Sequence, residues 1–205
     1  GNVSSYTKND QKTSLSYDAN QNMIGIKSDD PNIGNVSYVY GAGSILEQTI
    51  KDGNTKNTYR GGGLTVNTLH NQDGSKSSTI SALGGVFTGN TYEALLTDGS
   101  DVVGSLGLKN GISQLDKHQI FTPYGISSSL LNSAPQKEGL TSGNTQGYRG
   151  MSTDSVTGWQ FLGNGYRAYN PTMRVFLKQD SWSPLIAGIN LSLIHISEPT
   201  RLSGI

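Results

Sequence analysis

The sequence has no cysteine among its 205 residues, which excludes disulfide bridges and thiolate metal sites. Charge is also scarce: charged residues make up 15% of the chain, and 15 basic residues balance 15 acidic ones to a formal net charge of zero. A neutral chain has no field that attracts nucleic acid or an anionic membrane surface. No apolar run approaches the roughly 20 residues that cross a bilayer. We therefore expect no nucleic-acid partner and no membrane contact.

Hydrophobic residues make up only 33% of the chain, which is less than in most globular domains. The sequence is rich instead in glycine, with 27 residues, and in Ser, Thr and Asn. Gly, Asn, Asp and Ser form turns, whereas Tyr, Val, Ile and Thr favour strands. Because apolar residues recur in short blocks along the whole chain, the composition predicts many short antiparallel strands and an all-β fold.

The two ends of the sequence differ from its middle. Residues 1–10 lack an initiator methionine and the charged and apolar regions of a signal peptide, so we expect the chain to begin inside a longer polypeptide. Residues 191–201 read LSLIHISEPTR, which resembles the translation of a transposon-based sequencing-library adapter. We interpret residues 191–205 as a non-native tail, and a native amphipathic tail is the alternative.

A hairpin pattern begins near the N-terminus. Leu15 and Tyr17 lie two residues apart, as one face of a strand requires, and a polar turn follows over residues 18–22. Tyr38 follows Tyr17 by 21 residues, which corresponds to about one hairpin per repeat. The segment resembles the tyrosine-aspartate (YD) repeat, with Tyr17 and Asp18 as the signature pair. Gln21 stands where that repeat usually has Gly, and since a positive φ would be strained there, we expect another type of turn.

The hairpin pattern continues through the middle of the chain. We predict a strand over residues 45–50, a turn at residues 51–54, and a bulge or sharp bend at Gly84 and Gly85. Residues 92–97 read YEALLT, and we favour a strand over a helical turn there because Asp-Gly closes the segment. Residues 127–144 are rich in Ser, Asn, Gln and Lys and predict a surface loop.

The richest pattern lies in residues 157–184, which read TGWQFLGNGYRAYNPTMRVFLKQDSWSP. It predicts a strand, a glycine turn, a second strand that ends at Asn-Pro, and another short strand. The order of residues resembles the Rhs repeat-associated core, and the earlier stretch ending in Tyr124 and Gly125 resembles another landmark of that family. The motif residues in the longer run are Gly158, Gly163, Gly165, Tyr166, Arg167, Tyr169, Asn170, Pro171, Phe176, Asp180, Ser181 and Pro184.

This resemblance implies both a fold and a function. In Rhs toxins, and in the C component of insecticidal Tc toxin complexes, to which this sequence is most similar, stacked hairpins form the wall of a hollow, spiralling shell. The resemblance implies a repeat sheet over residues 1–125 and a truncated core segment over residues 126–190. Such a sheet would grow without a central core, because each hairpin packs on its neighbours. An isolated wall segment would also expose a sheet edge and an inner face, so we expect poor solubility.

The implied role is to enclose and help deliver a C-terminal toxin effector. The implied partners are a shell half like the B component of Tc complexes and the protein's own effector. The implied location is outside the producing bacterium. An extracellular YD-repeat module for adhesion or carbohydrate binding is an alternative.

A second alternative is the aspartate autoprotease found in these shells, in which two aspartates share a proton. Those aspartates lie in Asp-Pro-x-Gly motifs, which this sequence lacks, since Asp30-Pro31 is followed by Asn32. We therefore expect no catalysis by this chain and interpret Asp180 as a turn-capping residue.

Other candidate ligands are isolated in the sequence. Gly61, Gly62 and Gly63 lack the following Lys and Ser/Thr of a phosphate-binding loop, and His70 and His118 have no second ligand at strand or helix spacing. We expect neither a metal nor another cofactor. Arg149, Arg167 and the Tyr166/Tyr169 pair could form a sugar or nucleobase platform, but stacking and packing within the sheet is the interpretation we favour.

Overall fold

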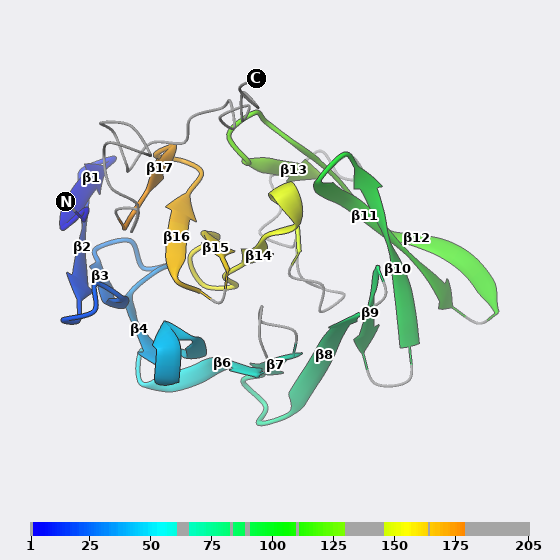
Figure 1. Cartoon of the computed structure of the whole chain (residues 1–205), viewed down its shortest axis with the longest axis horizontal. Helices are drawn as coiled ribbons and strands as arrows, with labels where there is room; N and C mark the ends of the chain where they lie inside the picture. Colours follow the sequence, from blue (N-terminus) through cyan, green and yellow to red (C-terminus); the bar gives the residue numbers. More distant parts are fainter. Residues whose placement is uncertain are drawn as a thin grey trace, which may run out of the picture.

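The computed structural model describes residues 2–60, 66–82, 84–88, 91–109, 111–129, 146–163 and 165–178. Their strands form two antiparallel sheets, one of thirteen strands and one of four (Figure 1). The long sheet takes its strands in sequence order, so each strand pairs with the next one along the chain. The predicted all-β fold of stacked antiparallel hairpins is therefore confirmed.

The strands of the long sheet are β1 (Ser5–Lys8), β2 (Gln11–Tyr17), β3 (Met23–Ser28), β4 (Asn35–Tyr40), β5 (Leu46–Lys51), β6 (Asn54–Arg60), β7 (Val66–His70), β8 (Lys76–Ala82), β9 (Gly85–Thr88), β10 (Thr91–Asp98), β11 (Asp101–Lys109), β12 (Ile112–Phe121) and β13 (Ser127–Ser129). A short 3-10 turn, η1 (Ala42–Ser44), separates β4 from β5. The strand predicted over residues 92–97 is confirmed as β10.

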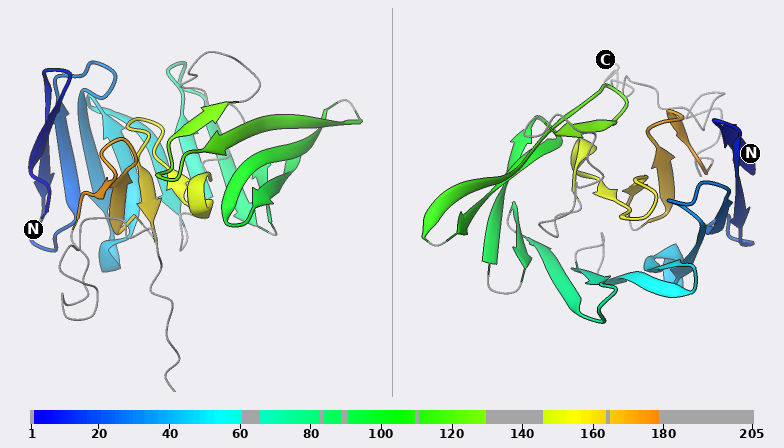
Figure 2. Two further views of the ribbon diagram at one scale, coloured as in Figure 1. Left: turned by 90° about the horizontal axis from the view of Figure 1, so that it is seen from above. Right: turned by 180° about the vertical axis from the view of Figure 1, so that it is seen from behind.

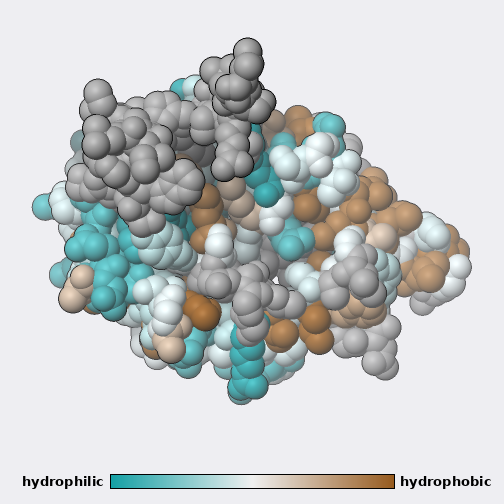
Figure 3. Space-filling view, viewed as in Figure 1, coloured by the Kyte–Doolittle hydropathy of each residue, from teal (hydrophilic) through white to brown (hydrophobic). Residues whose placement is uncertain are grey.

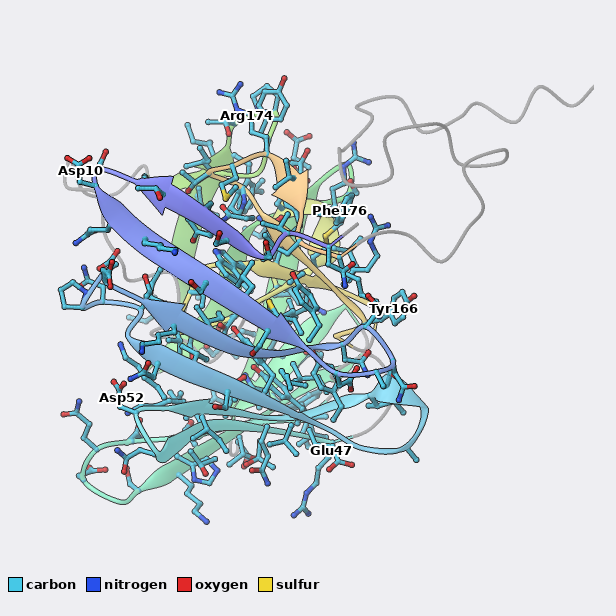
Figure 4. All side chains as sticks on the ribbon, turned by 90° about the vertical axis from the view of Figure 1, so that its left-hand side faces the viewer. Asp10, Glu47, Asp52, Tyr166, Arg174 and Phe176 are labelled. Atoms are coloured by element: carbon cyan, nitrogen blue, oxygen red, sulfur yellow. The ribbon has the colours of Figure 1, made fainter. Side chains whose placement is uncertain are left out.

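Two-residue turns set the register of several hairpins. Asn9 and Asp10, with φ of 49° and 61°, join β1 to β2, and Asp52 and Gly53, with φ of 48° and 78°, join β5 to β6. Two successive positive φ values match the right-handed twist of the flanking strands. Asp10 and Asp52 therefore lie at turns along the same rim of the sheet, and Glu47 lies at the opposite rim (Figure 4).

The long sheet curves because its strands carry extra residues at intervals. The register shifts between Ser16 and Tyr17, between Val39 and Tyr40, and again between Leu96 and Thr97. Such bulges bend a strand and increase its local twist. The sheet consequently follows an arc from β1 to β13, and the second sheet lies on the inner side of that arc (Figures 1 and 2).

The second sheet comes from the segment with the richest sequence pattern. It contains β14 (Ser152–Thr153), β15 (Gln160–Leu162), β16 (Arg167–Asn170) and β17 (Val175–Phe176), and the 3-10 turn η3 (Tyr148–Gly150) precedes it. The succession of strand, glycine turn, strand and short strand is as predicted. The last described strand of the long sheet is β13, and the predicted domain boundary at residues 125/126 stays a prediction.

An apolar core lies between the two sheets, where the sequence led us to expect no central core. Leu15, Ile26, Val36, Tyr38, Leu46 and Tyr59 of the long sheet are buried against Trp159, Phe161, Ala168 and Leu177. The rings of Tyr38 and Phe161 meet edge to face with their centroids 5.7 Å apart. Burial of each large apolar side chain contributes about 1.5–3 kcal/mol, so the second sheet stabilises the strands that it covers.

Three further expectations concern turns and loops. Gln21 has a φ of 65°, so the positive φ is adopted here without glycine, and our expectation that this strain would be avoided by another turn type is wrong. Gly84, with a φ of 72°, forms the predicted sharp bend between β8 and β9. The predicted surface loop over residues 127–144 is wrong at its start, because Ser127–Ser129 pair with β12 as strand β13.

Several predicted features lie outside the described residues. These are residues 61–63, the remainder of the loop from residue 130 to residue 144, Asp180, Ser181, Pro184 and the tail at residues 191–205. The described part of the chain contains no helix with the length and hydropathy needed to cross a membrane.

Candidate functional site

Tyr17, the first residue of the Tyr17-Asp18 pair, connects the two ends of the described chain. The hydroxyl of Tyr17 lies 2.8 Å from the carbonyl oxygens of both Val3 and Leu177, which share its one proton as acceptors. The backbone N–H of Val3 also donates to the Leu177 carbonyl, at 3.0 Å. Burial raises the pKa of Tyr17, so the hydroxyl keeps its proton for these bonds. We call this contact between the first hairpin and the C-terminal strand segment the seam, and define it by Val3, Tyr17, Asn22, Leu177 and Lys178.

Asp18, the second residue of this pair, orders the turn that leads into the seam. Asp18 accepts hydrogen bonds from the backbone N–H of Asn22 at 2.8 Å and from its side-chain amide at 3.0 Å. The same amide group donates to the hydroxyl of Ser44 at 2.9 Å, and Asn22 is 2% exposed. Asp18 thus holds Asn22 in one orientation, which leaves the amide oxygen of Asn22 turned toward Lys178.

Lys178 brings a buried ammonium group to the seam. It is 4% exposed, and its Nζ lies 3.4 Å from Asn22 Oδ1 and 3.6 Å from the centre of the Tyr166 ring. An amide oxygen and an aromatic face both stabilise a cation that has lost its water. The ring of Tyr166 thus packs over the Lys178 ammonium group. Figure 4 labels Tyr166 at the edge of the molecule.

Two motif glycines sit where a side chain would collide. At Gly165, with a φ of 85°, an added Cβ would lie 2.4 Å from Cβ of Leu46, the fully buried first residue of β5. At Gly125, with a φ of 81°, an added Cβ would lie 2.7 Å from the Tyr148 ring. Gly158 and Gly163 also have positive φ, of 71° and 59°, but face open space.

The remaining motif residues hold the second sheet together. The Arg167 guanidinium lies 3.8 Å from the centre of the Phe176 ring. Tyr169 is fully buried and donates its hydroxyl to the Tyr124 carbonyl at 3.0 Å. Asn170 Oδ1 accepts the backbone N–H groups of the residues two and three positions later, at 3.0 and 3.1 Å, so it ends β16 as an Asx turn at Asn170-Pro171.

The sequence analysis missed one buried carboxyl group, that of Asp154. Its Oδ2 accepts hydrogen bonds from the hydroxyl of Tyr38 at 2.9 Å and from the hydroxyl and backbone N–H of Thr157 at 2.6 and 3.2 Å. Its Oδ1 is buried without a hydrogen-bond partner among the described residues. Burial raises the pKa of Asp154; burial and then the neighbouring carboxylate raise the pKa of Tyr38. The sequence did carry a signal for the role of Asp154. Thr157 follows it by three residues and Gly158 by four, a spacing typical of a side chain that caps its own turn.

A cavity of about 750 Å³ opens beside this turn on the inner side of the arc. Its lining includes Lys51 and Asp52 from the β5–β6 turn, Gln119 from β12, and Asp154 and Gln160 around the second sheet. The amide of Gln119 donates to the Val102 carbonyl at 2.8 Å, and that of Gln160 donates to the Gly125 carbonyl at 3.0 Å. The side-chain amides of Gln119 and Gln160 are therefore engaged in hydrogen bonds to neighbouring backbone segments.

The motif residues Gly125, Gly158 and Pro171 also line this cavity, whereas His70 and Arg149 do not. His70 shares a 2.9 Å hydrogen bond with the Thr58 hydroxyl, and the side chain of His118 lies outside the described ones. The Arg149 guanidinium lies 5.8 Å from the centre of the adjacent Tyr148 ring. Among the described residues, no group of three or more His, Asp or Glu side chains is placed to hold a metal ion.

Comparison with known proteins gives matches in structure. No protein-family model and no curated protein matches the sequence. The structure is similar to the crystal structures titled TcdB2-TccC3-TEV and TcdB2-TccC3, each with 16% sequence identity and a TM-score of 0.61. It is also similar to TcdB2-TccC3 without its hypervariable C-terminal region, with 15% identity and a TM-score of 0.62. Each match covers 90% of this chain but 10% of the other, so the chain spans about a tenth of the length of these proteins. The chain therefore shares its fold with one section of these Tc toxin components.

Proposed function

We propose that this chain is a section of the wall of a toxin-enclosing shell of the Rhs and Tc type. The observation that carries the proposal is the thirteen-stranded arc with a second sheet on its inner side, which matches the TcdB2-TccC3 structures over 90% of the chain. A sheet in which each strand pairs with its sequence neighbour can extend by adding hairpins. This architecture suits a wall that encloses a large volume.

The proposed role is structural. Two acidic side chains among the described residues are engaged in holding the fold: Asp18 accepts from Asn22, and Asp154 accepts from Tyr38 and Thr157. Oδ2 of Asp154 accepts three hydrogen bonds that hold the turn and Tyr38, and we assign this carboxyl group to packing between the two sheets. The chain would thus contribute a wall, and any cleavage of the effector would depend on other residues.

The partners that we propose follow from the same role. The wall section would close against a shell half like the B component of Tc complexes, and would enclose an effector that follows it in the same polypeptide. Such a protein would act outside the bacterium that makes it. The Tyr17–Asp18 motif supports a YD-type wall, because its hydrogen bonds join a hairpin to a segment 160 residues away.

A segment exchange tests this function. The equivalent section of a TcdB2-TccC3 shell would be replaced by residues 2–178, and assembly with protection of the enclosed effector from added protease would be measured. We expect an assembled, protease-resistant shell, because the two backbones match. As controls, the native section would be reinserted through the same junctions, and Leu46→Asp in the exchanged section would disrupt the core between the sheets. Failure of the exchange where the reinsertion control assembles would refute a wall function.

A further inference from the structure

The two faces of the long sheet differ along the chain in whether their side chains are apolar or polar. On β6, Tyr59 points to the inner face and is 4% exposed under the second sheet. The register continues this inner face through Asn67 on β7 and Thr79 on β8, which are also buried. The inner face therefore carries more polar side chains after β6, with the apolar Val86, which pairs with Ser81, also buried on it.

The outer face becomes apolar over β8 to β12. Ile80 follows Thr79 and so points outward; it forms one cross-strand row with Phe87 and Tyr92. Two residues after Tyr92, on the same face, Ala94 begins a second row with Leu106 and Leu115. We define the outer apolar patch by six residues: Ile80, Phe87, Tyr92, Leu106, Leu108 and Leu115. Figure 3 shows hydrophobic surface gathered over this end of the molecule, at β10 to β12.

The side chains of the patch are 36–65% exposed, with Leu108 the most open. The rings of Phe87 and Tyr92 lie 4.7 Å apart and present one aromatic surface. With about 200 Å² for each large side chain, the six expose on the order of 500 Å². This is at the upper end of what a monomer leaves uncovered. Two such patches together reach the roughly 1,000 Å² at which specific protein interfaces begin.

We propose that the outer apolar patch is an interface between two copies of this chain. Two twisted sheets pack face to face about 10 Å apart with their strands within about 30° of each other. A two-fold axis brings the same patch from each copy together, so Phe87, Leu106 and Leu115 meet the equivalent residues of the second copy. An interface of this size lies at the low end of specific interfaces, where weak and transient associations are found, so we expect a reversible dimer. The proposal depends on the outer face alone and does not require the wall function.

Sedimentation velocity of the purified 205-residue chain, over about 1 to 100 µM, tests the proposal. We expect a reversible monomer–dimer equilibrium. The double variant Leu106→Glu/Leu115→Lys places opposite charges directly across two strands, which a sheet tolerates, but makes the patch charged. It should weaken the dimer at least about tenfold. Ser14→Glu is the matched control, because it creates the same Glu–Lys pair opposite Lys27 on the outer face of β2 and β3, outside the patch.

A second measurement does not depend on the folding of the charged variant. Because the chain has no cysteine, Leu106→Cys supplies a single thiol, and Ser14→Cys supplies the matched one. The thiol at position 106 should react with a maleimide more slowly as protein concentration rises, by about tenfold once dimers dominate, while that at position 14 should not.

The remaining outcomes all overturn the proposal. These are a monomer throughout the concentration range, large irregular aggregates without a dimer, and a dimer that the double variant leaves unchanged. Monomers that bind neutral phosphatidylcholine vesicles through the same residues would assign the patch to a lipid surface instead.

Discussion

The hydroxyl of Tyr17 donates to the carbonyl of Leu177, at 2.8 Å, across 160 positions of the sequence. This bond attaches the first hairpin of the long sheet to the last described strand segment of the second sheet. Tyr17→Phe keeps the ring but removes the donor, and we expect it to lower the free energy of unfolding by about 1 kcal/mol.

Urea denaturation measures this difference. Tyr166→Phe is the matched control, since it removes a hydroxyl and keeps the ring that lies over Lys178. The control should stay within about 0.5 kcal/mol of the unchanged chain. Equal effects of the two substitutions would show that the Tyr17 hydroxyl does not stabilise the seam.

Asn22→Ala should be more disruptive than the tyrosine change. It removes the amide that donates to Asp18 and Ser44 and the oxygen nearest the Lys178 ammonium group. A buried cation that loses a polar partner at the seam is costly, so we expect a loss of about 2–4 kcal/mol in the free energy of unfolding. Asn20→Ala, at an exposed position of the same turn, is the control and should have little effect.

Gly165→Ala combines backbone strain with a collision. Its φ is 85°, and the new Cβ would lie 2.4 Å from Cβ of Leu46. We expect a loss of more than about 2 kcal/mol, from strain and displaced core packing together. Gly158→Ala separates the two causes, because its φ is 71° but its surroundings are open, and about 1 kcal/mol is expected there. Thermal unfolding of both variants gives the comparison, and a smaller loss for Gly165→Ala would contradict the predicted collision.

The buried Asp154 should make stability depend on pH. Burial raises its pKa in the folded chain, so the folded state holds the proton more tightly than the unfolded state, in which the pKa is about 3.9. The contribution of Asp154 to the free energy of unfolding is thus fully present below about pH 3.9 and is lost as the pH rises through its pKa in the folded chain. Within that window the slope approaches about 1.4 kcal/mol per pH unit.

Asp154→Asn removes this titration while keeping the shape of the side chain. The free energies of unfolding of the two proteins, measured from about pH 4 to 8, should diverge, with the unchanged chain losing stability relative to the variant as the pH rises. Parallel curves over the whole range would mean that Asp154 keeps an ordinary pKa in the folded state.

The strands of this protein were predictable because their signals are local. Leu15 and Tyr17 on β2, and Val36 and Tyr38 on β4, alternate with polar residues as a half-buried strand requires, and Asp52-Gly53 is a turn dipeptide whatever surrounds it. The errors came where a distant contact overrides a local preference. Gln21 accepts a strained φ in a turn that Asp18 and Asn22 hold closed, and Ser127–Ser129 become a strand because β12 offers an edge.

The sequence indicated which motif residues belong to the candidate site, but not which contacts they make or which charged side chains are buried there. Glycines such as Gly165 are recognisable as motif positions, but the collision with Leu46 depends on how the second sheet lies in the arc. Asp154 and Lys178 read as ordinary surface charges in the sequence, yet both are buried. Their partners, Tyr38 and Asn22, lie 116 and 156 residues away, too far for any local pattern to indicate.

By itself, the amino-acid sequence determined that this chain forms short antiparallel strands joined by tight turns, since period-two alternation and turn residues act over only a few positions. Only the tertiary structure decided which face of each hairpin is covered, that a core exists between two sheets, and that the outer face of β8 to β12 is left apolar and open. Burial depends on what the rest of the chain places above a strand, and that arrangement arises when segments more than 100 residues apart come into contact.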